Sequence, residues 1–231
     1  MSYVSYLTEG ERVGLRPFRL ADGPEFTTHA HESRNLHRPW LFPPTTTGEY
    51  ESYATRLIED GARAGFLVCE LATGAIAGFV NVNNIVHGAF QCGALGYGAF
   101  AHAAGRGLFR EALGLVLGHA FAPAADGGLG LHRLEANVQP GNTASIALVR
   151  GRGFRLEGLS PDFLYIDGAL VRPLNECAIS RGVCAVPKVP QSRNTSAGAK
   201  VLWGILAGKN RVNRLCGFGM RRLFLNGFPL I

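Results

Sequence analysis

The chain has 231 residues, of which 47% are hydrophobic and 17% are charged, and its formal net charge at pH 7 is +6. This length and composition suit one globular domain with a sizeable core and exclude an intrinsically disordered chain. No apolar run approaches the ~20 residues of a membrane-spanning helix, and the N-terminus lacks the basic region and apolar core of a signal peptide, so we expect a cytoplasmic protein with no membrane partner.

The first part of the chain predicts a strand, two helices and a proline-rich loop. The segment "VGLRPFRLADGPEFTTHAH" is typical of a strand followed by a helix, for which Asp22 and Glu25 have the spacing of a capping box. The segment "RPWLFPPTTTGEY" is expected to be a loop because its three prolines lack amide donors. A second helix is expected from near Thr47 to near Gly61 or Gly65.

The middle of the chain predicts a hairpin and then a strand that enters a glycine-rich loop. Two apolar runs in "GFLVCELATGAIAGFVNVNNIVHGAF" flank the turn pair Thr73-Gly74. The next segment, "QCGALGYGAFAHAAGRG", adds a strand and the loop. A helix follows in "LFREALGLVLGHAFAP", where apolar residues recur at helical spacing: Leu108, Ala112, Leu115, Val116 and Ala120.

The last regular elements are a strand, a short helix and a hairpin. They correspond to "HRLEANVQP", to "NTASIALVRGRGF" and to "RLEGLSPDFLYIDGALVRPLNECAIS", in which two strands surround the turn pair Asp167-Gly168. Because strands and helices alternate, we predict an α/β fold in which helices cover a mixed sheet. The pattern fades after Arg181, so we place the domain at residues 1–181.

Residues 182–231 differ from the rest of the chain in charge and composition. No Asp or Glu occurs after Glu176, whereas eight Lys or Arg residues lie from position 182 onward. Without these eight, 15 basic and 17 acidic residues remain, so the predicted domain is mildly acidic. Two interpretations stay open: a disordered basic tail that contacts RNA weakly, or aberrant sequence after a shift of reading frame.

The five cysteines predict neither a metal site nor a disulfide framework. Their number is odd, and no two of them form a C-x-x-C pair. We therefore expect no metal and read the thiols as buried or tolerated.

The segment "GYGAFAHAAGRGLFREAL" carries the strongest local signal for ligand binding. The first turn of a helix leaves amide groups without internal partners, and together with the helix dipole these form a site for anions such as phosphate. Gly105 and Gly107 allow a bulky ligand to approach the backbone, and Arg106 adds positive charge. The alternative is that the glycines serve only the turn. Three nearby histidines lack an acid at a motif spacing and are expected to be surface or capping residues: His102, His119 and His132.

A second candidate site lies at the start of the short helix after Pro140-Gly141. Asn142 suits the N-cap position, and Ser145 can hydrogen-bond backbone within the first turn. The alternative is that both side chains point toward a ligand that runs along the sheet from the glycine-rich loop.

Taken together, these segments resemble the GNAT acetyltransferase superfamily, and within it the ribosomal-protein N-acetyltransferases of the RimJ/RimL type. The resemblance covers roughly residues 10–180 and is carried by "VGLRPFRLADGPEF", "HRPWLFP", "LGYGAFAHAAGRGLFREAL" and "LHRLEANVQPGNTASIALVRGRGFRLEG". The last segment is the most specific, because it combines a strand, P-x-N-x-x-S and a Gly-Phe step. The resemblance implies a GNAT fold with a mixed, mostly antiparallel central sheet flanked by helices, with acetyl-CoA as co-substrate and a primary amine as acceptor.

The resemblance also implies roles for individual residues. Amides of the loop that matches Q/R-x-x-G-x-G/A would hold the CoA pyrophosphate: Ala104, Gly105, Arg106, Gly107, Leu108 and Phe109. The strand around Tyr97, Gly98 and Ala99 would diverge from its neighbour, pair with pantetheine and polarise the thioester carbonyl. Asn142 would hold the pantetheine arm, and Ser145 would hydrogen-bond or protonate the leaving thiolate as general acid.

The chain departs from the family pattern at the general base. Relatives often place a carboxylate on the strand before the last hairpin turn, and the aligned position here is Leu164. Asp162 and Tyr165 lie nearby, and Glu135 on the preceding strand is the candidate base that we name. A base acting through water and an amine that binds already neutral are the alternatives. The first and last residues of the loop also differ from the family pattern, which a loop that binds through backbone amides tolerates.

The expected function is therefore acetyl-CoA-dependent N-acetylation of a primary amine. The RimJ/RimL resemblance implies that the acceptor is the N-terminal α-amine of a protein, of the ribosomal-protein type. Two alternatives are a small-molecule amine acetyltransferase and a catalytically idle acyl-CoA-binding module with an RNA-interacting tail. Ser145 favours an enzyme, whereas the missing base favours the idle module.

Overall fold

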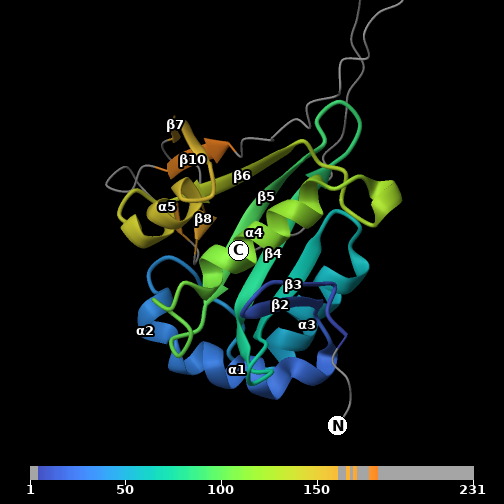
Figure 1. The fold of residues 1–231 in the computed structure, drawn as a ribbon. Coiled ribbons are helices and arrows are strands. Elements are labelled where there is room, and N and C mark those ends of the chain that lie inside the picture. Colours follow the sequence, from blue (N-terminus) through green and yellow to red (C-terminus); the bar gives the residue numbers. More distant parts are fainter. Residues whose placement is uncertain (1–4, 161–164, 167–168, 171–176, 182–231) are drawn as a thin grey trace, which may run out of the picture. The chain divides into compact units, whose positions relative to one another are not determined.

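The computed structural model describes residues 5–160, 165–166, 169–170 and 177–181 (Figure 1). Its strands are β1 (Thr8–Glu9), β2 (Val13–Pro17), β3 (Ala64–Glu70), β4 (Ile76–Val86), β5 (Cys92–Ala99), β6 (Arg133–Val138), β7 (Arg155–Ser160), β8 (Tyr165–Ile166), β9 (Ala169–Leu170) and β10 (Cys177–Arg181). Eight of them form one sheet in the order β1-β2-β3-β4-β5-β6-β10-β7. Among the described strands only β5 and β6 pair in parallel. The predicted mixed, mostly antiparallel α/β fold is confirmed.

Helices cover both faces of this sheet (Figure 1). They are α1 (Gly23–Glu32), α2 (Arg34–His37), α3 (Thr47–Glu59), α4 (Leu108–Phe121) and α5 (Thr143–Arg150), with short 3-10 turns at Leu20–Asp22 and Ala124–Asp126. Helices α4 and α5 bury Leu113 and Val149 in a first core, and α1 and α3 bury Phe26 and Tyr50 in a second core.

Strand β3 separates the two cores. Phe66 and Val68 lie in the first core, whereas Leu67 and Cys69 lie in the second. Successive side chains of a strand point to opposite faces of its sheet, so the two cores lie on opposite faces. This explains why "FLVC" is a continuous apolar run: a strand covered on both sides has no polar face.

The start of α3 follows the sequence prediction. The helix begins at Thr47, after an N-cap formed by Thr46. The amide of Glu49 donates to Thr46 Oγ1 at 3.4 Å, and Glu49 Oε2 accepts from the amide of Thr46 at 3.1 Å. This reciprocal pair is a capping box, and it fixes the chain where the proline-rich loop enters the helix.

The predicted capping box at the start of α1 is wrong. Asp22 makes no side-chain capping bond to α1. Its carboxylate instead accepts from the Arg16 guanidinium at 2.6 and 2.8 Å and from the amide of Arg19 at 3.0 Å. Arg16 is only 5% exposed, and a buried guanidinium is stable only with a partner. Glu25, the other predicted capping residue, accepts from the amide of Ile76 at 2.7 Å.

The C-terminal part of the sheet has more strands than the two predicted. β7 pairs with β10, and β10 also pairs with β6, so β10 lies between them. The additional strands β8 and β9 form a separate two-residue pair, and the turn pair predicted at positions 167–168 between them lies outside the described residues. The predicted tail at 182–231 also lies outside the described residues.

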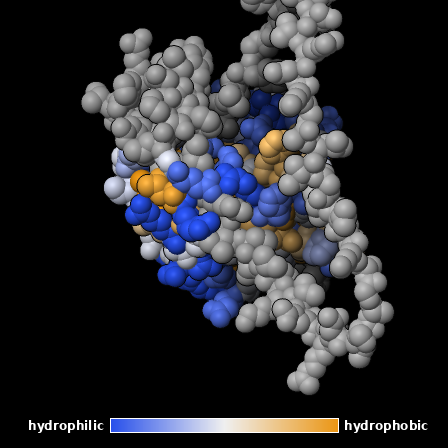
Figure 2. All heavy atoms as spheres, turned by 90° about the horizontal axis from the view of Figure 1, so that it is seen from above, coloured by the Kyte–Doolittle hydropathy of each residue, from blue (hydrophilic) through white to orange (hydrophobic). Residues whose placement is uncertain are grey.

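Large apolar side chains that stay exposed are scattered over different elements. They include Leu20, Ile58 and Phe90, which are 53%, 53% and 69% exposed. In Figure 2 the coloured surface is mostly hydrophilic, with separate hydrophobic areas. None of the helices in the described ranges is long and apolar enough to cross a membrane.

Candidate active site

The central feature of the site is a divergence of the two parallel strands. β5 and β6 pair from Cys92 with Arg133 to Leu95 with Ala136, and the pairing then stops. β5 continues to Ala99 with β4 as its neighbour on the other side. The last four residues of β5 therefore have one edge that no described strand covers.

The direction of the backbone groups shows which residues face this open edge. The amide of Phe100 donates to the carbonyl of Ala77 at 2.9 Å, so Phe100 is directed toward β4. Hydrogen-bonding direction alternates along an antiparallel strand, so Gly98 is also directed toward β4. Tyr97 and Ala99 then present their amides and carbonyls to the gap beside β6.

A loop rich in small residues leads from the end of β5 into α4. Gly105 and Gly107 adopt left-handed backbone conformations, with φ of 72° and 77°. In the described part of the chain, the amides from Gly105 to Arg110 have no hydrogen-bond partner. Amides at a helix N-terminus carry partial positive charge and bind anions, so this loop can hold a phosphate group without any side chain.

Not every predicted loop residue offers its amide. The amide of Ala104 donates to the carbonyl of Phe100 at 3.0 Å and is therefore used within the loop. The side chains of Leu108 and Phe109 are buried in the first core. A Cβ atom at Gly78 would lie only 2.5 Å from the Phe109 ring, so this ring packs directly on the sheet.

Charged side chains attach the loop to the neighbouring strands. The guanidinium of Arg106 forms an ion pair with Glu70, which lowers the pKa of that carboxyl. Arg12 donates to the carbonyl of Arg106 at 3.0 Å and pairs with Glu111 at 3.3 Å. Both arginines thus have acidic partners, and the attraction of this loop for an anion comes mainly from its amides.

The start of α5 reaches the same strand from the side of α4. Asn142 Oδ1 accepts from the amide of Ser145 at 3.1 Å and caps the helix. The hydroxyl of Ser145 lies 2.5 Å from the hydroxyl of Tyr97. Burial raises the pKa of Tyr97 to about 12, so the tyrosine stays protonated at neutral pH. The structure therefore joins two predicted site residues, Tyr97 and Ser145, in one hydroxyl pair.

The predicted base Glu135 lies in an ion-pair cluster. Its carboxylate accepts from the Arg133 guanidinium at 2.7 and 2.9 Å, and Arg133 also pairs with Glu157 at 2.6 Å. Glu135 is opposite Ala94, in the part of β6 that is still paired with β5. Asp162 and the aligned position Leu164 lie outside the described residues, and Tyr165 lies in β8.

His37 is a site residue that the sequence reasoning missed. Its Nε2 lies 2.7 Å from the carbonyl oxygen of Ala99, and its ring is only 3% exposed. A carbonyl can only accept, so Nε2 carries the proton and Nδ1 has a free lone pair. Within the described residues Nδ1 is buried without a partner. Burial lowers the pKa of His37, although the bond to Ala99 opposes this shift, so the ring is neutral at pH 7. The only sequence signal was its place in "HRPWLFP".

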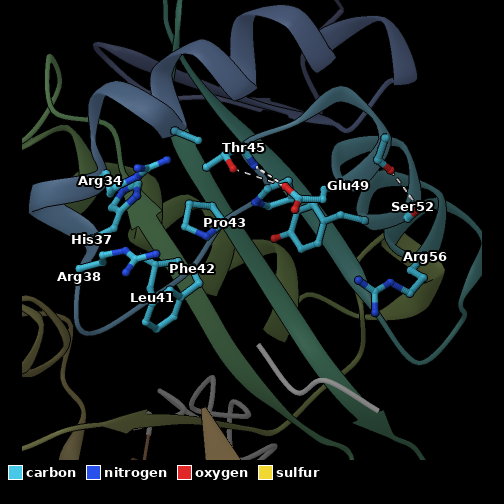
Figure 3. Close-up of a pocket in the computed structure, with 14 residues that line it drawn as sticks. Arg34, His37, Arg38, Leu41, Phe42, Pro43, Thr45, Glu49, Ser52 and Arg56 are labelled. Carbon is cyan, nitrogen blue, oxygen red and sulfur yellow. Dashed lines mark hydrogen bonds between the residues drawn. The ribbon is translucent and has the colours of Figure 1, made fainter. Parts of the chain in front are cut away.

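A cavity of about 620 Å³ opens beside His37 on the α1–α3 face (Figure 3). Its lining comes from α1 and α2, from the proline-rich loop after α2 and from α3. Leu41 lies on the loop side of this lining, and a Cβ atom at Gly98 would come within 2.9 Å of its side chain. Two residues of the cavity lining, His37 and Leu41, therefore contact β5 from the face opposite to α4 and α5.

Comparison with known proteins gives a consistent result. The sequence model described as "Acetyltransferase (GNAT) domain" matches residues 12–155. The chain is 27% identical over 170 residues to "Probable N-acetyltransferase YjcK" of Bacillus subtilis, covering 70% of this chain and 91% of that protein. It is 36% identical over 93 residues to the ribosomal protein uS5-alanine N-acetyltransferase of Escherichia coli, covering 40% of this chain and 45% of that enzyme.

A solved structure supports the same relationship. The structure of Mycobacterium smegmatis RimJ in complex with CoA-disulfide superposes with a TM-score of 0.64 at 28% identity, and the match covers 73% of this chain and 80% of that chain. In the described part of the chain, no group of three or more His, Cys, Asp or Glu residues could hold a metal ion.

Proposed function

The chain belongs to the GNAT acetyltransferase family, and we propose that it transfers the acetyl group of acetyl-CoA to the N-terminal α-amine of a protein, with a ribosomal protein as the first candidate. Members of this family are N-acetyltransferases that use acetyl-CoA. The acceptor and the roles of individual residues below are our proposal.

One observation carries the proposal: β5, one edge of which no described strand covers, has different surroundings on its two faces. The loop from Gly105 to Arg110 and helix α5 approach it from one face, and the cavity beside His37 approaches it from the other. A transferase that joins two substrates directly needs such an arrangement, because the reacting atoms must meet in a fixed geometry.

We propose that CoA binds along this edge. The free loop amides would accept the pyrophosphate, and Asn142 would lie beside the pantetheine arm. The amides of Tyr97 and Ala99 are directed into the gap, where the Tyr97 amide can donate to the thioester carbonyl. A fixed donor of this kind stabilises the oxyanion that forms when the amine attacks.

Departure of the thiolate requires a proton donor. As the new C–N bond forms and the C–S bond breaks, Ser145 would give a proton to the sulfur and take one from the Tyr97 hydroxyl, 2.5 Å away. Burial raises the pKa of Tyr97, so its proton is present at neutral pH. The same rise makes the tyrosine a weak acid, so it would give up the proton only in concert with cleavage of the C–S bond, and the tyrosinate would regain a proton from water afterwards. This assigns Ser145 as general acid, with Tyr97 as its proton source.

The amine must also lose a proton, and two bases are proposed in order. His37 lines the acceptor cavity and is neutral, and the lone pair on its Nδ1 is free but buried, so the transfer requires a movement of the surrounding side chains that brings the amine to Nδ1. Glu135, the base named from the sequence, is second in order because it is bonded to Arg133 and lies opposite Ala94, in the part of β6 that is still paired with β5. The two can be separated by variants, since Glu135→Gln and His37→Gln remove one base each.

The test is a thiol-release assay with acetyl-CoA and a panel of amines. Peptides with a free α-amine should release CoA thiol well above background, and N-terminally blocked peptides of the same sequence should not. Mass spectrometry should place one acetyl group on the α-amine. If a small amine is acetylated more efficiently than any peptide, the acceptor is a small molecule and the proposed protein acceptor is wrong. If CoA binds tightly but no amine causes release of CoA thiol, the chain is an acyl-CoA-binding module without transferase activity.

A further inference from the structure

The acceptor cavity has an arginine-rich lining. Arg34 and Arg38 lie one helical turn apart, since the amide of Arg38 donates to the carbonyl of Arg34 at 3.0 Å. Both are exposed and lie beside His37 in Figure 3, and Arg56 of α3 lines the cavity further along. The cavity therefore has two adjacent guanidinium groups beside His37, the lining residue that is hydrogen-bonded to β5.

These arginines have no acidic partners in the described part of the chain. None of the three forms an ion pair there. Arg38 instead lies over the Phe42 ring, with its Cζ 5.0 Å from the ring centre. Glu49 is the one carboxylate in the cavity lining, and its Oε2 accepts from the amides of Thr45 and Thr46 at 2.9 and 3.1 Å.

The charge of the cavity is opposite to that of the domain around it. Residues 1–181 contain 15 Lys or Arg and 17 Asp or Glu, whereas the cavity lining contains three arginines and one glutamate. Outside the cavity some arginines are paired, as Arg12 and Arg133 are, and others, such as Arg19 and Arg110, form no ion pair with a described residue. What distinguishes Arg34, Arg38 and Arg56 is that they line one cavity, and a negatively charged ligand would explain this grouping.

We propose that this cavity selects an acceptor whose first residues after the reactive amine carry carboxylates, that is, an acidic N-terminal segment of a protein. This inference rests on the proposed function, because it specifies the acceptor of the same reaction. Arginine binds carboxylates through two parallel hydrogen bonds. When the α-amine of the acceptor lies at His37, the guanidinium groups of Arg34 and Arg38 lie close enough to bind the carboxylates of the next residues of the acceptor. A polyamine would place its extra ammonium groups beside these guanidinium groups and be repelled.

The experiment compares three peptides of equal length with the same N-terminal alanine. Positions two to four carry Asp and Glu in the first peptide, Asn and Gln in the second, and Lys in the third. The acidic peptide should have the highest kcat/KM, by about tenfold over the amide peptide at low salt, mainly through KM, which follows from two partly exposed ion pairs. The preference should shrink as salt is added, because exposed charges are screened.

Variants locate the preference. Arg34→Gln/Arg38→Gln should bring the acidic and amide peptides to equal KM, and Arg34→Glu/Arg38→Glu should favour the lysine peptide. Arg19→Gln, at an exposed arginine outside the cavity, is the matched control and should keep the acidic preference. CoA titration and thermal melting of each variant show that the fold and the cofactor site are intact.

The outcomes separate this inference from the proposed function. If all three peptides are acetylated with equal efficiency, the enzyme is a peptide α-amine acetyltransferase and the acidic selectivity is wrong. If free glutamate or aspartate is acetylated far better than the acidic peptide, the cavity does recognise carboxylates, but the acceptor is an amino acid and not a protein. If no α-amine is acetylated, the proposed function itself fails.

Discussion

Replacing Ser145 with alanine tests the proposed departure of the thiolate. Loss of one preorganised donor in a well-formed site costs about 2.7–4 kcal/mol in kcat. Here the Tyr97 hydroxyl lies 2.5 Å from the oxygen that is removed and stays in place, and water can fill the space between them. We therefore expect a smaller loss of about 1.4–2.7 kcal/mol, which is a tenfold to 100-fold decrease in kcat.

Affinity for CoA should stay close to wild type in this variant, because the pyrophosphate is expected to bind backbone amides of the loop. Single-turnover thiol release gives the rate of the chemical step, and calorimetric titration gives the CoA affinity. Tyr97→Phe should lower the same rate, because Ser145 then loses its proton source. The double variant should lose less than the sum of the two single losses, since both belong to one pathway.

Two results would refute this reasoning. If Ser145→Ala turns over within twofold of wild type, neither hydroxyl assists the leaving group. If its effects and those of Tyr97→Phe are fully additive, the two hydroxyls act independently and the hydrogen bond between them is only structural.

Four further changes have defined outcomes. His37→Gln should lower kcat about 100-fold, at the low end of general-base catalysis. Since burial depresses the folded-state pKa of His37, wild-type stability should also fall as the pH drops below ~6.5, where the unfolded chain binds more protons, and melts of the variant should show a smaller fall. Gly107→Val should weaken CoA binding, because a β-branched residue at φ 77° is strained; unchanged affinity by calorimetry would place the cofactor elsewhere. Asp22→Ala should lower the free energy of unfolding by about 3–5 kcal/mol, because it leaves the buried Arg16 without its partner, and denaturant titration measures this loss. Truncation after Arg181 should leave the melting temperature and the CoA affinity unchanged and remove any salt-sensitive RNA binding. Aggregation of the truncated protein would show that the domain boundary at residue 181 is wrong.

Two segments with capping-box spacing, of which only the second was predicted to form the box, show why local pattern alone has limits. Thr46 with Glu49, and Asp22 with Glu25, have the same spacing in the sequence. The first forms a capping box in an exposed loop, where Glu49 accepts from the amides of Thr45 and Thr46 and forms no ion pair with a described residue. The second does not, because the guanidinium of Arg16 is buried beneath it and takes the carboxylate. Spacing predicts which bonds are possible, and the tertiary surroundings determine which of them form.

The residues of the candidate site likewise fall into those that local sequence indicates and those that depend on distant contacts. Asn142 and Ser145 act within one helical turn, and the loop glycines lie in one short segment, so the sequence pointed to them. His37 could not be found in this manner, because its partner Ala99 is 62 residues away and no motif connects them. The cavity likewise depends on how three helices and a proline-rich loop pack together.

The two halves of the site use different chemistry, and this difference bears on how acceptor specificity is encoded. The proposed cofactor side uses mainly backbone amides, which persist through many side-chain substitutions as long as the left-handed glycines remain. The proposed acceptor side consists of side chains from α2, from the residue that follows it and from α3. Its arginines are exposed and have no ion-pair partner among the described residues: Arg34, Arg38 and Arg56. Exchanging these arginines removes little packing and few hydrogen bonds, so the choice of amine can change while CoA binding is retained. The charge-reversed variant tests this separation directly, since it should change the preferred peptide without altering the affinity for CoA.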